Sequence, residues 1–130
     1  MNNEQKMVKD FHDKYHCVSN MRPTMIDVKT LFLRARLISE EAAEFLTAAQ
    51  TENMEQMADS LCDLLVVVYG TAVTLGIDLE PLFAEVHRSN MTKDGGGKDI
   101  GGKVIKGPNY EPPQLDFLIK KQSEQEKYWM

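Results

Sequence analysis

The chain has few cysteines and no long apolar run, and these two absences narrow the kinds of protein that it can be. Of its 130 residues only Cys17 and Cys62 are cysteines, and they form no Cys-x-x-Cys pair. The longest apolar run, from Leu64 to Tyr69, is too short to span a bilayer, and no secretion signal stands in the sequence. We therefore expect a reduced, cytoplasmic protein with no membrane partner.

Basic residues are also in the minority. The formal net charge is −5 at pH 7, and lysine and arginine form no continuous basic stripe. Proteins bind the nucleic-acid backbone mainly through such stripes, so we expect no nucleic-acid partner. The excess of acidic side chains is instead typical of a protein that binds cations.

No segment alternates between apolar and polar residues as a half-buried strand does. Apolar residues follow helical spacing instead, which predicts helices over about 5–18, 28–50, 54–75 and 78–90, the last reaching 93 at most. Because the connections are short, neighbouring helices should be antiparallel. We predict an all-α fold, a four-helix bundle over about residues 5–93 within a single domain that spans 1–130.

The length of the chain bears on its assembly. A domain of 130 residues can bury a core, but it is small for an active site enclosed by its own walls. We therefore expect a homo-oligomer, either a dimer or a tetramer.

Two acidic patches interrupt helical stretches that are otherwise apolar. The first consists of Glu40, Glu41 and Glu44, and the second of Asp59 and Asp63. Helical geometry puts residues three or four apart on one face, so two facing helices can present these carboxylates to one small volume. Buried carboxylates are costly unless a cation compensates them. The pattern therefore predicts a divalent-metal site with all five as candidate ligands, and oxygen ligands favour Mg²⁺ or Mn²⁺.

Asp63 is the main support for this interpretation. The predicted helix over 54–75 is apolar almost all round, which is typical of a central buried helix. An aspartate in its middle needs compensation, either from a metal or from a structural arginine, for which Arg34 and Arg36 are available. The patch at 40–44, taken alone, is equally typical of a solvated helix face.

A segment rich in glycine and lysine follows the predicted bundle. Residues 94–110 hold six of the eight glycines, and Lys93 and Lys103 bracket most of them. Glycine lets backbone N–H groups approach a ligand closely, and lysine supplies cationic donors for phosphate oxygens. We predict a phosphate-binding flap over about 94–114 and a frayed polar tail over 115–130. A flexible linker is the alternative for the flap.

These motifs resemble the all-α nucleoside triphosphate pyrophosphohydrolase superfamily, which includes MazG proteins and phosphoribosyl-ATP pyrophosphohydrolase. Its first motif, Glu-Glu-x-x-Glu, is similar to residues 40–44. Its second motif, Glu-x-x-Asp, matches Asp63, but Ser60 stands at the glutamate position and Asp59 is the expected substitute. Three longer segments resemble the phosphoribosyl-ATP pyrophosphohydrolase branch, namely 63–72, 87–93 and 102–110.

The resemblance implies a MazG-like bundle that hydrolyses an NTP or dNTP to the monophosphate and diphosphate. The reaction would use Mg²⁺, for which Mn²⁺ can substitute. Glu41 would bind the metal or accept the proton of the attacking water. Small phage-encoded relatives act on dGTP, which implies a purine nucleotide as one option for the substrate. The resemblance also implies that the substrate phosphates lie near Asn90, Lys93, Lys103, Lys106 and Tyr110.

Two other classes of protein stay open. A di-iron carboxylate protein would need Glu-x-x-His motifs, and the nearest match is the single segment from Asp13 to His16. A non-catalytic helical interaction module would explain the helices, but it needs neither a buried Asp63 nor a flap. His12 and His16 lie four residues apart beside Cys17, and we interpret them as surface or half-buried side chains rather than zinc ligands.

Overall fold

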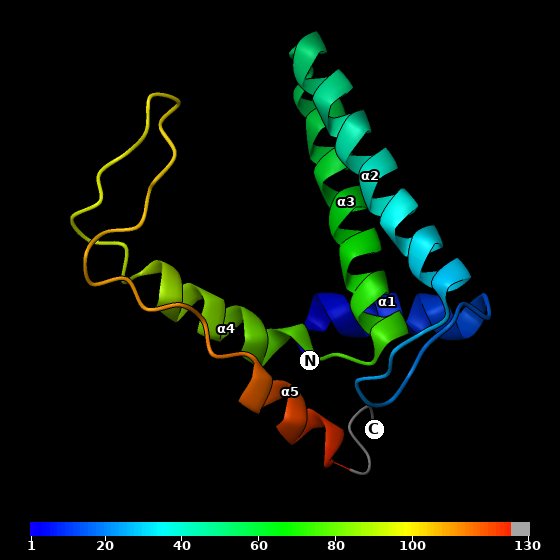
Figure 1. The fold of residues 1–130 in the computed structure, drawn as a ribbon. Helices are drawn as coiled ribbons and strands as arrows, with labels where there is room; N and C mark the ends of the chain where they lie inside the picture. The colour runs from blue at the N-terminus through cyan, green and yellow to red at the C-terminus, as the bar shows by residue number, and fades with distance from the viewer. Residues whose placement is uncertain (126–130) are drawn as a thin grey trace.

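A computed structural model describes residues 1–125 of the chain and contains five α-helices over that range. Figure 1 shows them in chain order: α1 (Asn3–Lys14), α2 (Val28–Thr51), α3 (Met54–Leu75), α4 (Leu79–Asn90) and α5 (Asp116–Ser123). The prediction of an all-α fold is confirmed, and the bounds of α2, α3 and α4 agree with it to within a residue or two. The helix α5 was not predicted, since 115–130 was expected to be a frayed tail; residues 126–130 of that tail lie outside the described range.

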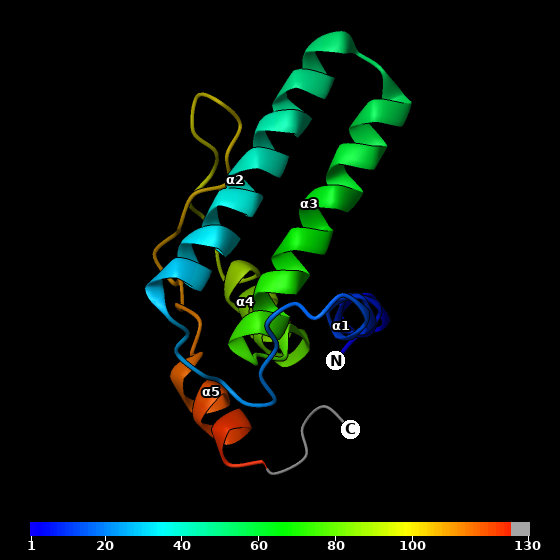
Figure 2. The same ribbon diagram turned by 90° about the vertical axis from the view of Figure 1, so that its right-hand side faces the viewer.

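The helices α2 and α3 form a long antiparallel hairpin (Figures 1 and 2). Glu52 ends α2 in the left-handed conformation with φ of 53°, and Asn53 then caps α3 by accepting a hydrogen bond from the Gln56 amide at 3.1 Å. A left-handed residue followed by an N-cap reverses the chain within two residues. This tight turn aligns the two acidic patches along one seam between the helices.

The first helix packs against α3 near the base of the hairpin. It ends at Lys14 and not at Val18 as predicted, because the amide of Cys17 bonds to the carbonyl of His12 at 2.9 Å. His16 takes up the resulting reversal in the left-handed conformation, with φ of 56°. Apolar spacing continued past this point, so the pattern did not reveal where the helix stopped.

Two buried glutamines fix the short connection between α3 and α4. Gln5 of α1 donates to the Ile77 carbonyl at 2.8 Å and accepts from the Leu79 amide at 3.1 Å. Gln122 of α5 accepts from the Asp78 amide and donates to the Asp78 carbonyl, both at 3.0 Å. Buried backbone groups need such hydrogen-bond partners. The two side chains therefore anchor α1 and α5 to the connection between α3 and α4.

The fourth helix leads away from the base of the hairpin and carries a second arm (Figure 1). Within this arm the two limbs of the glycine-rich segment approach closely, and the amide of Ile105 bonds to the carbonyl of Gly97 at 3.1 Å. The base of the arm is tied to α4 by Ser89, which donates to the Glu111 carbonyl at 2.7 Å. The segment therefore has a defined path, and it lies apart from the hairpin.

The central helix α3 is less buried than its composition predicts. Leu61 and Leu65 are 47% and 53% exposed, and Cys62, expected in a buried helix, is also exposed. The reason is that α2 and α1 cover only part of its surface. Within the described residues, Met54–Leu75 is also the one helix long and apolar enough to cross a membrane by length and composition, a test that core helices of soluble proteins pass too. The sequence argument, which considered only the apolar run from 64 to 69, missed this.

Gly76 offers a test of how α3 ends. It caps the helix with φ of 74°, and a Cβ there would collide with the carbonyl of Arg22. We expect Gly76→Ala to lower the free energy of unfolding by about 1–3 kcal/mol in urea denaturation. Gly76→Asn is the control, because asparagine tolerates a positive φ but also carries a Cβ; wild-type stability in that variant would show that the Arg22 contact is unimportant.

Candidate metal centre

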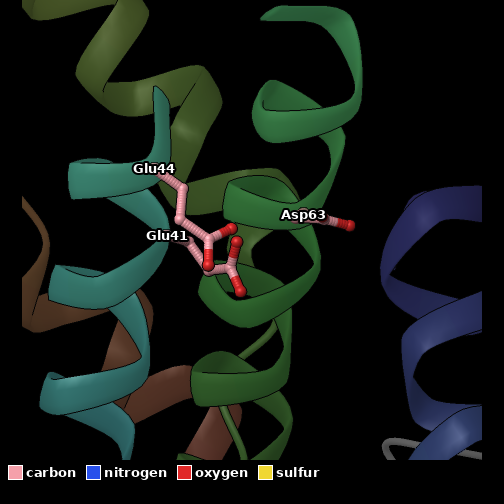
Figure 3. Close-up of side chains that lie close together, drawn as sticks. All are labelled: Glu41, Glu44 and Asp63. Atoms are coloured by element: carbon pink, nitrogen blue, oxygen red, sulfur yellow. The ribbon is translucent and has the colours of Figure 1, made fainter. Parts of the chain in front are cut away.

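Three carboxylates meet in the seam of the α2–α3 hairpin. Glu41 and Glu44 extend from α2 and Asp63 belongs to the facing α3 (Figure 3). One oxygen from each lies within 4.8 Å of the others. Glu41 and Glu44 are three residues apart and so share a face of α2, and the antiparallel pairing brings Asp63 to the same level. Carboxylate oxygens gathered in this way are the ligands that Mg²⁺ and Mn²⁺ prefer.

The Glu41 carboxylate is the most constrained of the three. Its Oε2 atom is buried and has no hydrogen-bond partner in the structure. Desolvation, followed by the negative charge of Glu44 and then of Asp63, raises the pKa of Glu41 above its usual range. A buried acceptor without a donor costs free energy, and a cation bound at this oxygen would remove that cost.

No basic side chain compensates these acids within residues 1–125. Arg34 and Arg36 were the candidates for a structural partner of Asp63, but neither reaches it. Arg34 donates to the Thr71 hydroxyl at 3.2 Å and to the Val67 carbonyl at 3.1 Å. Arg36 forms an exposed ion pair with Glu40 at 3.5 Å. The structural-arginine alternative therefore does not apply, and the donor set fits a divalent metal.

The other two predicted ligands lie outside this cluster. Glu40 points away into its exposed pair with Arg36, because it is about 100° round the helix from Glu41. Asp59 is exposed and lines an adjoining hollow of about 330 Å³ together with Glu44 and Gln56. Ser60, at the position of the family glutamate, is the buried residue of this turn. The structure thus brings three of the five predicted carboxylates together, with Asp59 beside them.

The predicted phosphate-binding residues lie on the other arm. Asn90 ends α4, and Lys93 follows it in the first turn of the connecting segment. The Lys106 ammonium lies over the ring of Tyr110, 4.9 Å from its centroid. Lys103 stands at the outer end of the arm beside an Asp99 turn. In Figure 1 this arm is separated from the hairpin, so these residues do not meet the carboxylates of their own chain.

Sequence reasoning missed one group at this seam. It treated Arg34 only as a possible ion-pair partner, yet the structure buries Arg34 to 8% exposure against Gly70 of α3. A Cβ on Gly70 would collide with the Arg34 Nη2 and lie 2.9 Å from His12 Nε2. His12 is itself buried, contrary to its interpretation as a surface or half-buried residue. The isolated glycine within an apolar helix was the available signal, since it marks a close approach of another group.

Comparison with known proteins agrees with this geometry. The family model described as phosphoribosyl-ATP pyrophosphohydrolase matches residues 8–90, a range that holds both acidic patches and the whole α2–α3 hairpin. The chain belongs to the phosphoribosyl-ATP pyrophosphohydrolase family. This family is part of the MazG-like all-α NTP pyrophosphohydrolase superfamily, so the resemblance drawn from the motifs is confirmed.

The family match ends at Asn90. It therefore leaves out Lys93, Lys103, Lys106 and Tyr110, and the role of the second arm stays a prediction. The chain is also 38% identical over 52 residues to the uncharacterized protein L479 of Acanthamoeba polyphaga mimivirus. That similarity covers 40% of this chain and 21% of the viral protein, so the chain matches about a fifth of that relative's length.

Substitution of the clustered carboxylates tests the metal centre. We expect Asp63→Asn and Glu44→Gln each to weaken Mn²⁺ binding at least about tenfold in calorimetry, since each removes a ligand charge and preserves shape. The matched control is Glu40→Gln, which changes a neighbouring glutamate outside the cluster and should bind Mn²⁺ like the wild type. Equal weakening in Glu40→Gln would contradict the assignment of the cluster.

Neutralising Glu41 should stabilise the metal-free protein. The folded state raises the pKa of Glu41, so the metal-free protein loses stability as the pH rises from the ordinary range of a glutamate through that raised pKa. Glu41→Gln removes this loss, and its melting temperature without metal should exceed that of the wild type at neutral pH. A lower melting temperature at neutral pH would show that repulsion in the cluster is unimportant.

Proposed function

We propose that this chain is a Mg²⁺-dependent nucleoside triphosphate pyrophosphohydrolase that converts an NTP or dNTP and water to the monophosphate and diphosphate. The observation that carries the proposal is the meeting of Glu41, Glu44 and Asp63 around a buried oxygen without a donor. Membership of a pyrophosphohydrolase family supports the reaction class. Within that class we propose a purine nucleotide such as dGTP as the substrate, as the resemblance to small phage relatives suggests.

Glu41, Glu44 and Asp63 would hold the metal, with Asp59 available from the adjoining hollow. When bound, Mg²⁺ would neutralise phosphate charge and lower the pKa of a coordinated water. Mn²⁺ has the same preference for oxygen and should replace it.

The side chain of Glu41 suits the proton transfer. A water oxygen attacks the α-phosphorus, the bond from that phosphorus to the bridging oxygen breaks, and diphosphate leaves. The proton of the water would pass to the Glu41 carboxylate, which lies within the cluster that would hold the metal. Lysines near the leaving diphosphate would neutralise its developing charge.

A second copy of the chain would supply those lysines. The carboxylate cluster has no basic partner in its own chain among residues 1–125, and the lysine-bearing arm extends away from it. Large apolar side chains of the hairpin are exposed to solvent, including Phe32 at 68% and Leu46 at 63% exposure. Apolar surface of this kind is typical of an interface. We propose a homo-oligomer in which the arm of one copy supplies Asn90, Lys93, Lys103, Lys106 and Tyr110 to the carboxylates of another.

Measurement of pyrophosphate release across a panel of NTPs and dNTPs tests the reaction. We expect release that requires Mg²⁺ or Mn²⁺, and loss of more than nine tenths of it in Asp63→Asn, which corresponds to at least about 1.4 kcal/mol of barrier. Release of orthophosphate instead would contradict the proposed bond cleavage. No turnover of any nucleotide would favour a non-catalytic interaction module, and iron-dependent absorbance would favour a di-iron protein.

Mixing two inactive variants tests the shared site. In a dimer, an Asp63→Asn chain paired with a Lys103→Ala chain would form one site that has both an intact cluster and an intact arm. Co-refolding the two variants in equal amounts should therefore restore about one quarter of the wild-type activity. Each variant refolded alone is the control and should stay inactive. A mixture that stays as inactive as its components would contradict an arm that acts on another copy.

A further inference from the structure

A cavity of about 460 Å³ lies between α1 and the hairpin, and its lining includes Leu37, one helical turn before Glu41 on α2. Most of its walls are apolar or aromatic, including Phe11, Leu33 and Leu37, while Arg34 and Thr30 are polar lining residues. Its volume falls in the range of small-ligand pockets, and apolar walls with few polar groups are typical of them. The family reaction, as derived above, uses none of these side chains.

Arg34 is the unusual member of this wall. It is only 8% exposed and forms no ion pair within the described residues. Its Nε and Nη2 groups bond to Thr71 and Val67, but its Nη1 amino group has no hydrogen-bond partner in residues 1–125. Nη1 is not among the buried polar atoms that lack a partner, so it is open to the cavity, where a ligand with acceptor atoms could bind it.

The charged groups near Arg34 do not supply that acceptor. His12 bonds through Nδ1 to the Val18 carbonyl at 3.1 Å, and desolvation, aided by the charge of Arg34, lowers its pKa. His16 also lines the cavity and adds no negative charge. Cys17 also lines the wall and interacts electrostatically with Arg34, but desolvation is the larger influence and lowers the pKa of Arg34.

The position of Arg34 relates the cavity to the metal centre. Arg34 and Glu41 are seven residues apart on α2, which puts them on the same face and about 10 Å apart along the helix axis. Leu37 lies between them and lines the cavity. This separation is of the order of the distance from the phosphates of a nucleotide to the far edge of its base.

We infer that this cavity holds the base of the nucleotide and that Arg34 reads a 6-oxopurine, guanine or hypoxanthine, through its unused donors. The inference rests on the proposed function, which places the phosphates at the carboxylate cluster. Guanine presents the adjacent acceptors O6 and N7, which match the donors of a guanidinium, whereas adenine presents an amino donor beside N7. An adenine would therefore set its amino donor against the donors of the guanidinium and lose that hydrogen bond.

The experiment uses two readouts, kcat/KM for dGTP against dATP, and calorimetric binding of guanosine against adenosine without metal. In the wild type both should favour the 6-oxopurine. Arg34→Lys keeps the charge but loses the planar donor pair, and it should reduce the preference about tenfold or more.

Gly70→Ala provides a second variant in case Arg34→Lys folds poorly. The added methyl group would displace the end of the Arg34 side chain and press on His12, while alanine favours the helix more than glycine does; circular dichroism checks that the helices are retained. It should reduce the preference as Arg34→Lys does. Cys17→Ser changes another wall residue and should leave the preference unchanged.

The two readouts separate the inference from the proposed function. Guanosine binding without turnover of any nucleotide would overturn the proposed function and leave the base pocket in place. Equal binding of guanosine and adenosine by the wild type, or an unchanged preference in both Arg34→Lys and Gly70→Ala, would overturn the base pocket even if pyrophosphate is released.

Discussion

The structure depends on the seam between α2 and α3, where charged groups lie in a contact that is otherwise apolar. Along this seam, Arg34 and the cluster of Glu41, Glu44 and Asp63 lie about two helical turns apart, and Arg34 forms no ion pair within residues 1–125. Opposite charges at that spacing do not neutralise each other directly. The acids therefore need a cation from outside, whereas the guanidinium already donates to Thr71 and Val67 and keeps Nη1 for a further acceptor. In the proposed complex, the metal would bind the acids and the base of the nucleotide would accept from the guanidinium.

The overall shape gives a second constraint. The hairpin and the arm carried by α4 extend from a common base, which is fastened by Gln5 and Gln122. This base fixes where the hairpin and the arm begin, but it does not bring them into contact with each other. The hairpin keeps apolar side chains such as Phe32 and Leu46 exposed, and a further copy of the chain would both cover them and supply cations to the acids. Stability and catalysis would then depend on the same contact.

Sequence patterns predicted the elements well and their surroundings poorly. The caps at Asn53 and Gly76 and the apolar spacing of α2 and α3 are local properties, so helix bounds could be read from neighbouring residues. The end of α1 and the helix α5 were missed, because a contact to His12 and a buried Gln122 decide them. Burial of α3 was overestimated, since composition shows that a helix is apolar but not how many neighbours cover it.

The sequence by itself determined the all-α fold, the family and the two acidic patches, because helical period and residue type are present in the order of the chain. Only the tertiary structure decided which acids meet. Glu40 and Glu41 are adjacent in sequence, yet one pairs with Arg36 at the surface and the other lies in the seam, since a helix turns about 100° per residue. That Arg34 forms no ion pair within residues 1–125 also appeared only in three dimensions, because an ion pair depends on every element that packs around the group.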